Sequence, residues 1–172
     1  MEFINYIRDI PDFPKKGILY KDISPLLKNK KAFSYTIEQF YTRHKHNNID
    51  KVIGIEARGF IFGAALANEL GCAFIPIRKP NKLPYKTFKQ KYSLEYGTDT
   101  VEIHKDAIEN DDNILLIDDV LATGGTACAA IDLLENFNCN FLECLFLLEL
   151  TFLDGVNKIL EKRKKSFSLL KV

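Results

Sequence analysis

The chain of 172 residues is long enough to bury a hydrophobic core as a single domain, without disulfides or a structural metal. Its 24 Lys and Arg against 23 Asp and Glu give a formal charge of +1, which excludes an overall field that would attract nucleic acid or membranes. The four cysteines lack a C-x-x-C spacing, and the N-terminus lacks the basic flank and long apolar run of a signal peptide, so we expect a reduced, cytoplasmic protein without a membrane segment.

Predicted helices and strands alternate in the first half of the chain. In order, they are a helix over 32–44, a strand over 52–55, a helix over 60–70 and a strand over 73–77. Gly71 follows the second helix, as a C-terminal cap does. Pro76 cannot donate a ladder hydrogen bond, so the last of these strands is predicted to lie at a sheet edge or to bend.

The segment 80–97 has a different pattern, because it is rich in lysine and aromatic residues and has no helical period. The residues from Thr98 to His104 then alternate like a strand, so 92–104 is predicted to be a hairpin that turns at Gly97. A long basic segment between the helices and strands of a compact domain is usually a disordered loop or a functional lid. Each lysine alone is best explained as a solvated charge, but beside an anion-binding cleft the segment of about 80–100 is interpreted as a lid.

Residues 114–126 read I-L-L-I-D-D-V-L-A-T-G-G-T and are the most informative part of the chain. Four aliphatic residues suited to a buried parallel strand lead into two carboxylates, a small-residue turn and an Ala-rich helix. A further strand over 141–148 and a helix near 154–162 follow. This alternation predicts an α/β fold with a central, mostly parallel sheet flanked by helices, in the manner of Rossmann-like proteins.

Charged or glycine-rich segments follow three of the predicted strands, namely 56–59, 78–79 and 118–126. Ligands of open parallel sheets bind at the carboxyl ends of the strands. The three segments should therefore converge on one cleft.

The turn after the acidic pair is predicted to bind a monophosphate. Backbone N–H groups from Ala122 to Thr126 can point into one concavity, because Gly124 and Gly125 tolerate positive φ and the next helix aims its positive end there. The hydroxyls of Thr123 and Thr126 add donors. Asp118 and Asp119 would repel a second bare phosphate, so they suit sugar hydroxyls or Mg²⁺. If the strand stays extended through the pair, the two carboxylates point to opposite faces, so one of them is expected to contact the ligand and the other to support that contact or to be linked to the metal.

The competing interpretation is the second acidic motif of a P-loop nucleotidase. It requires G-x-x-x-x-G-K-[ST] elsewhere in the chain. The nearest candidate is 54–59, but Phe60 follows where lysine should stand. The nucleotidase interpretation is therefore disfavoured.

The acidic pair and the T-G-G-T turn resemble the phosphoribosyl pyrophosphate (PRPP) signature of the type I phosphoribosyltransferases. The resemblance implies that Asp118 and Asp119 attend the ribose hydroxyls with Mg²⁺ nearby, and that 122–126 holds the 5′-phosphate. Over nearly its full length the chain resembles the adenine-specific members of that family. The segments that carry this are F-P-K-K-G-I-L-Y-K-D-I-S-P (13–25), E-A-R-G-F (56–60), K-L-P (82–84), Y-S-L-E-Y-G (92–97) and L-E-L (148–150).

The resemblance also implies roles for individual residues. Tyr20 would stack on adenine while the backbone of Leu19 and Lys21 reads the edge of the ring. The loop Ala57-Arg58-Gly59 would hold pyrophosphate. The further pyrophosphate ligands it implies are Arg78, Lys79 and Lys82. Glu95 resembles the lid glutamate that acts near N7 of the purine, so the catalytic set would be Glu95, Asp118, Asp119 and Arg58.

The resemblance further implies the organisation of the molecule. Residues 1–172 would form one phosphoribosyltransferase domain with an N-terminal hood of about 1–30, and a homodimer with 56–60 near its interface. The predicted reaction is purine salvage, in which adenine and PRPP give AMP and pyrophosphate.

Two other functions stay open. One is the same reaction on hypoxanthine, guanine or orotate, although no lysine suited to a 6-oxo group follows the signature. The other is a non-catalytic regulator that binds PRPP, although the chain lacks an added DNA-binding domain or a basic face. Asn81 departs from the family, since glycine is frequent there. The three histidines, His44, His46 and His104, are predicted to lie at the surface.

Overall fold

The computed structural model describes residues 2–93 and 97–172. Segments rich in Ile, Leu and Val form a five-stranded parallel sheet. The strand order is β4-β3-β7-β8-β9, and every neighbouring pair is parallel. The strands are β3 (Lys51–Ile55), β4 (Ala73–Ile77), β7 (Asn113–Leu121), β8 (Asn140–Glu149) and β9 (Ser166–Lys171). The predicted α/β class is confirmed, and β4, which contains Pro76, lies at an edge.

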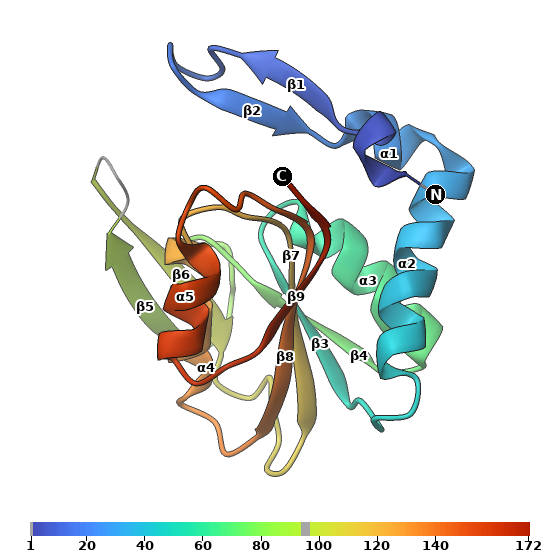
Figure 1. Cartoon of the computed structure of the whole chain (residues 1–172). Coiled ribbons are helices and arrows are strands. Elements are labelled where there is room, and N and C mark those ends of the chain that lie inside the picture. Colours follow the sequence, from blue (N-terminus) through green and yellow to red (C-terminus); the bar gives the residue numbers. More distant parts are fainter. Residues whose placement is uncertain (1, 94–96) are drawn as a thin grey trace.

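Helices cover both faces of the sheet (Figure 1). They are α1 (Ser24–Lys28), α2 (Lys30–His44), α3 (Gly59–Leu70), α4 (Gly125–Leu134) and α5 (Gly155–Glu161), with a short 3₁₀ helix at Phe3–Tyr6. In β7, Ile114 and Leu116 pack with α4, whereas Leu115 and Ile117 pack with α2 and α3. This strand is therefore buried on both sides, as its unbroken apolar run predicted.

The predicted helix ends agree with the structure to within two residues. Gly71 caps α3 with a left-handed φ of 70°. The side chain of Asn29 accepts a hydrogen bond of 3.0 Å from the Ala32 N–H, so α2 begins two residues before the predicted helix. Among the described residues, no helix has the length and apolar character needed to span a membrane.

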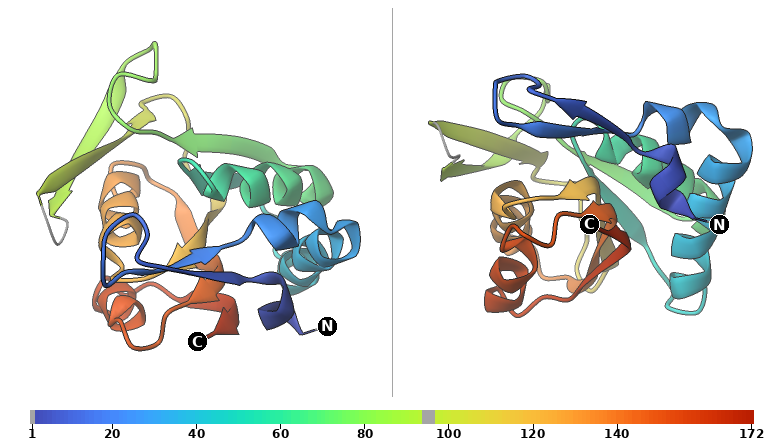
Figure 2. Two further views of the ribbon diagram at one scale, coloured as in Figure 1. Left: turned by 90° about the horizontal axis from the view of Figure 1, so that it is seen from above. Right: turned by 45° about the horizontal axis from the view of Figure 1, so that its top comes forward.

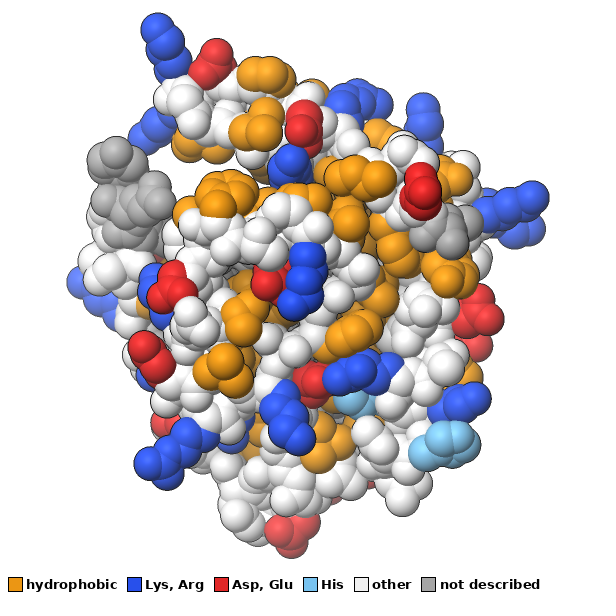
Figure 3. Space-filling view, in the orientation of Figure 1, with side chains coloured by type: hydrophobic (Ala, Val, Ile, Leu, Met, Phe, Trp, Pro, Cys, Tyr) orange, Lys and Arg blue, Asp and Glu red, His pale blue; other side chains and the backbone are white. Residues whose placement is uncertain are grey.

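Two antiparallel hairpins stand outside the central sheet. The first pairs β1 (Arg8–Pro11) with β2 (Leu19–Asp22), and the second pairs β5 (Thr87–Ser93) with β6 (Thr98–His104). The β1–β2 hairpin lies over the carboxyl ends of the strands (Figures 1 and 2). Acidic and basic side chains are interspersed over the face drawn in Figure 3, as expected for a chain of nearly zero net charge.

The second hairpin is longer than predicted, because β5 begins at Thr87 and not at Tyr92. Phe88, Gln90 and Tyr92 are partly buried on one side of β5, while the lysines between them are exposed. The ring of Phe88 packs edge-on against Phe137 with centroids 5.4 Å apart. The lysines obscured this alternation in the sequence.

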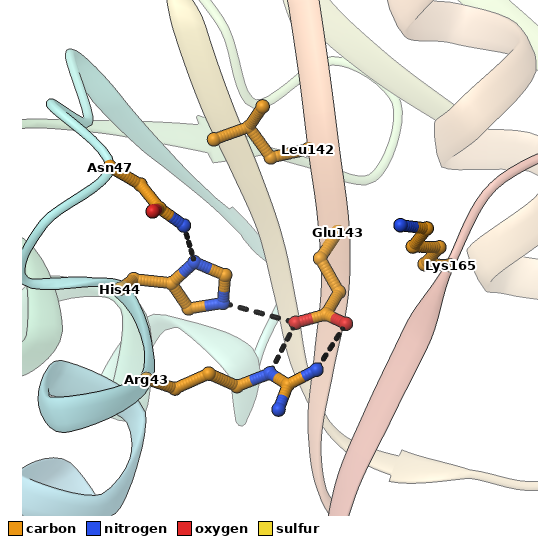
Figure 4. A pocket seen from close by; sticks show the side chains of 6 residues that line it. All are labelled: Arg43, His44, Asn47, Leu142, Glu143 and Lys165. Atoms are coloured by element: carbon orange, nitrogen blue, oxygen red, sulfur yellow. Dashed lines mark hydrogen bonds and ion pairs between the residues drawn. The ribbon is translucent and has the colours of Figure 1, made fainter.

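The prediction of a surface position was wrong for His44, which is 4% exposed. Its Nε2 lies 3.1 Å from a carboxylate oxygen of Glu143 in β8 (Figure 4). Arg43 donates two hydrogen bonds of 2.6 and 2.7 Å to the same carboxylate, and the Asn47 side chain lies 3.1 Å from His44 Nδ1. Burial alone would raise the pKa of Glu143, but the bonds from Arg43 and His44 lower it to about 2.

We expect Glu143→Gln to destabilise the fold by about 1 to 2 kcal/mol at pH 7, because Arg43, whose side chain is 40% exposed, loses its counter-ion and the buried His44 loses a charged partner. The pKa of Glu143 is lower in the folded than in the unfolded chain, so its stabilisation is present above the usual value of 4.5 and disappears as the pH falls towards about 2. Urea unfolding at pH 7 and pH 3 checks this. The difference between variant and wild type should shrink at the lower pH, and a constant difference would contradict the pairing.

Candidate functional site

The turn between β7 and α4 forms a small cavity at the carboxyl edge of the sheet. Its volume is about 80 Å³, and it is lined by Asp118, 120–127 and Phe146. Gly124 has a φ of 78°, and a Cβ atom there would lie 3.0 Å from both the Cα and the O atom of Gly155. The turn is therefore held between its own strand and the start of α5, with the N-terminus of α4 behind it.

The strand stays extended through the acidic pair, so the two side chains leave opposite faces of the sheet, but their carboxylates remain close enough to interact. Asp118 lines the cavity of the turn and accepts a 2.9 Å hydrogen bond from the Asp119 N–H. Burial raises the pKa of Asp118 well above its usual value, and repulsion from Asp119 adds to the rise. A Cβ on Gly59 would lie 2.8 Å from the Ile117 carbonyl oxygen, so only glycine lets α3 start this close to β7.

Asp119 points to Arg58, which follows β3. The Arg58 Nε lies 2.7 Å from Asp119 Oδ2, and the Asp119 residue is 4% exposed. Burial raises the pKa of Asp119, and the positive charge of Arg58 opposes the rise. The segments after β3 and β7 thus meet, as predicted from the parallel sheet.

Arg58 also contacts the β1–β2 hairpin. Its Nη1 donates a 2.6 Å hydrogen bond to the Tyr20 hydroxyl, and its guanidinium carbon lies 5.1 Å from the Tyr20 ring centroid. Leu19 is 48% exposed, and the Lys21 ammonium forms a 2.7 Å ion pair with Asp9. One side chain therefore connects the predicted adenine segment to the acidic pair.

The Glu56 carboxylate accepts hydrogen bonds from the basic residues that follow β4. It accepts bonds from the Lys79 N–H at 2.8 Å, from Arg78 Nε at 3.3 Å and from the Lys82 ammonium. Burial opposes ionisation, but these donors lower the pKa of Glu56 to about 2. Asn81 adopts a φ of 64° in this loop, which explains how asparagine serves where the family often has glycine.

The Lys79 side chain points to a different carboxylate, that of Asp99 in β6. Its ammonium contacts Asp99 Oδ2 and donates a 3.0 Å hydrogen bond to the Tyr92 hydroxyl. Thr126 Oγ1 in turn donates a 3.3 Å bond to that hydroxyl. The predicted site residues from four segments are thereby brought together, whereas Glu95 lies outside the described residues.

Glu56 and Asp99 were not predicted as site residues. Glu56 stands directly before the predicted pyrophosphate loop, so its position could have drawn attention to it. Asp99 sits opposite Tyr92 in the hairpin register, which only a correct placement of β5 would have revealed.

The described residues contain no cluster of three or more His, Cys, Asp or Glu that could hold a metal ion alone. The acidic pair supplies two carboxylates, and the buried Asp119 Oδ2 contacts Arg58 as an ion pair without a well-formed hydrogen bond. Mg²⁺ is commonly held by one or two carboxylates together with substrate phosphates and water. The donor set fits a magnesium ion that arrives with a phosphorylated substrate.

Comparisons with known proteins identify the family. The model of the phosphoribosyl transferase domain matches residues 22–171. The chain is 52% identical over 170 residues to the adenine phosphoribosyltransferase of Geotalea uraniireducens, covering 99% of this chain and 98% of that protein. The chain belongs to the adenine phosphoribosyltransferase family.

Solved structures of the adenine phosphoribosyltransferase family have the same fold. The enzyme of Thermoanaerobacter pseudethanolicus matches with a TM-score of 0.94 and 48% identity, over 99% of this chain and 98% of its own. The Saccharomyces cerevisiae enzyme, complexed with an imino-altritol bisphosphate and adenine, matches with a TM-score of 0.92 and 40% identity, over 98% and 97% of the chains. The fold around the site is thus that of an adenine phosphoribosyltransferase.

Proposed function

We propose that the protein transfers the phosphoribosyl group of PRPP to adenine and releases pyrophosphate. The observation that carries this is the 52% identity to an adenine phosphoribosyltransferase over 99% of the chain. The Saccharomyces cerevisiae relative was crystallised with adenine itself. The product is AMP, so the activity is one of purine salvage.

The 5′-phosphate of PRPP binds the turn at 122–126, with the ribose hydroxyls at the acidic pair. The support is the cavity of about 80 Å³ between Asp118 and the N-terminus of α4, where backbone N–H groups favour an anion. Asp119, on the other face of the strand, faces Arg58 at 2.7 Å. The ribose therefore lies between the phosphate turn and the loop after β3.

Pyrophosphate binds the basic residues around the Glu56 loop. The proposed ligands are Ala57, Arg58, Gly59, Arg78, Lys79 and Lys82. The four cationic side chains among them all contact a carboxylate in the described structure, through Glu56, Asp99 or Asp119. These carboxylates hold the four cations close together without mutual repulsion, so the cations are in place before pyrophosphate binds.

The reaction forms a bond from adenine N9 to C1′ and breaks the bond from C1′ to the pyrophosphate oxygen. The ribose ring oxygen shares the positive charge that develops at C1′, and the cations oppose the negative charge on the leaving oxygen. Mg²⁺, when bound through the acidic pair and substrate oxygens, would add positive charge to the leaving group. Adenine loses one proton as N9 bonds to C1′: in the N7–H tautomer N9 carries the attacking lone pair, and we assign acceptance of the N7 proton to Glu95.

Adenine binds against β2, where Tyr20 stacks on the ring and the backbone of Leu19 and Lys21 meets its edge. The hydrogen bond from Arg58 supports this assignment, because it holds the Tyr20 hydroxyl 2.6 Å from the guanidinium of the pyrophosphate loop. We further propose that residues 1–172 act as one unit, with a hood of about 1–30 and a lid of about 80–100 that excludes water. The assembly we propose is a cytoplasmic homodimer.

The test is pyrophosphate release from PRPP and Mg²⁺ with adenine, hypoxanthine, guanine or orotate in parallel. We expect release with adenine at least about a hundredfold faster than with the other bases, since a site that hydrogen-bonds one base edge leaves polar groups unpaired with another. AMP should form in equal amount. Preference for another base would overturn the adenine pocket, and PRPP binding without turnover would favour a regulator.

A further inference from the structure

The contact between Lys79 and the β5–β6 hairpin distinguishes this lysine from the other cations of the site. Arg78 and Lys82 both pair with Glu56, the residue that follows their neighbouring strand β3. Lys79 instead pairs with Asp99, which belongs to the hairpin. Its position therefore depends on where the hairpin lies.

The strand register of the β5–β6 hairpin places Tyr92 beside Asp99, the carboxylate that pairs with Lys79. Tyr92 in β5 and Asp99 in β6 are directly opposite each other, and the Tyr92 hydroxyl donates a 3.2 Å bond to Asp99 Oδ2. The other carboxylate oxygen of Asp99 accepts a 2.7 Å bond from the Thr100 N–H. Burial opposes ionisation of Asp99, but the bonds from Lys79 and Thr100 lower its pKa overall, so the carboxylate is charged at neutral pH.

Packing holds this pair in place. Val101 and Ile103 of β6 are 1% and 0% exposed and belong to the core beneath α4. The ring of Tyr92 lies against the phosphate turn, because a Cβ on Gly125 would be 3.8 Å from Tyr92 Cδ2. The Tyr92–Asp99 pair lies towards the turn of the hairpin, and the packing of the Tyr92 ring against the core and the phosphate turn holds the pair where the carboxylate meets Lys79.

The Tyr92 hydroxyl completes the connection. It accepts hydrogen bonds from Lys79 Nζ at 3.0 Å and from Thr126 Oγ1 at 3.3 Å while donating to Asp99. A lysine ammonium has three N–H donors. In the described part of the chain, Asp99 and Tyr92 accept from two of them, which leaves a third donor for a ligand oxygen.

We propose that Asp99 is a positioning residue for the transfer reaction, which with the Tyr92 hydroxyl holds the Lys79 ammonium at a fixed distance from the phosphate turn. This inference rests on the proposed function, in which Lys79 contacts pyrophosphate and Thr126 contacts the 5′-phosphate. PRPP carries both groups, so a fixed separation between their ligands favours the extended substrate. Asp99 acts through Lys79 and touches no substrate atom.

The test is a double-mutant cycle between Asp99→Asn and Lys79→Gln, with steady-state kinetics for PRPP and adenine. In the wild-type background, Asp99→Asn should lower kcat about tenfold, because a misplaced cation stabilises the leaving group poorly, and should leave KM for adenine unchanged. In the Lys79→Gln background the same substitution should change kcat less than about twofold, since nothing remains to be positioned. Tyr92→Phe, which keeps the ring, should resemble Asp99→Asn.

Asp106→Asn is the matched control, because it removes one exposed carboxylate just beyond β6 and should leave all constants unchanged. If Asp99→Asn tightens PRPP binding without lowering kcat, Asp99 competes with the substrate for Lys79 and the proposal is wrong. An equal effect of Asp99→Asn in both backgrounds also overturns it. Wild-type turnover with adenine is measured first, so failure of the proposed function is recognised separately.

Discussion

Replacing Asp118 and Asp119 together by asparagine is expected to lower kcat by about a thousandfold or more while the protein stays folded. Asparagine has the shape of aspartate but cannot supply negative charge to a cationic ribose or to Mg²⁺. The fold should tolerate the change, because asparagine has nearly the same volume as aspartate and the substitution removes the repulsion between two neighbouring carboxylates. Steady-state assays at saturating PRPP and adenine check the loss of kcat. Far-UV circular dichroism of the same samples checks that the protein stays folded.

The single variants should differ, because the two carboxylates have different neighbours. Asp119→Asn also releases Arg58 from its ion pair at 2.7 Å, so it should alter KM for PRPP as well as kcat. Asp118→Asn leaves that pair intact and should act mainly on kcat. Turnover retained in the double variant would remove the acidic pair from the mechanism. Loss of the helical far-UV circular dichroism signal would mean that the lower kcat results from unfolding.

The central strands could be predicted because burial on both faces demands an unbroken apolar run. Ile114 to Ile117 are all buried, and their sequence alone is typical of such a strand. The strand β9 was not predicted, since Ser166–Lys171 is short and follows a basic run. It exists because it pairs with β8, a tertiary interaction that local pattern does not encode.

The site could be predicted as a set of converging strand ends, but its pairings could not. The meeting of Arg58 and Asp119 follows from parallel neighbours β3 and β7. The bond from Arg58 to Tyr20 depends on how the β1–β2 hairpin folds over the sheet, 38 residues away in sequence. The burial of His44 has the same origin, because its partner Glu143 is 99 residues away.

Gly124→Ala is expected to lower kcat/KM for PRPP by about a hundredfold or more, because two separate effects displace the phosphate turn. A φ of 78° is unfavourable for alanine, and its Cβ would lie 3.0 Å from the backbone of Gly155. Because Gly155 is the first residue of α5, its backbone cannot easily move away.

Gly71→Ala is the matched control, since φ there is 70° but nothing lies within 4 Å of the added atom. Both variants should lose about 1 kcal/mol of stability from the left-handed conformation, and Gly124→Ala should lose more. Steady-state kinetics and urea unfolding of both variants separate the displacement of the phosphate turn from the loss of stability. If Gly71→Ala loses activity to the same extent, the loss results from lower stability and not from the turn. If only Gly124→Ala loses activity, the contact between the turn and α5 is what holds the backbone N–H groups in place for the 5′-phosphate.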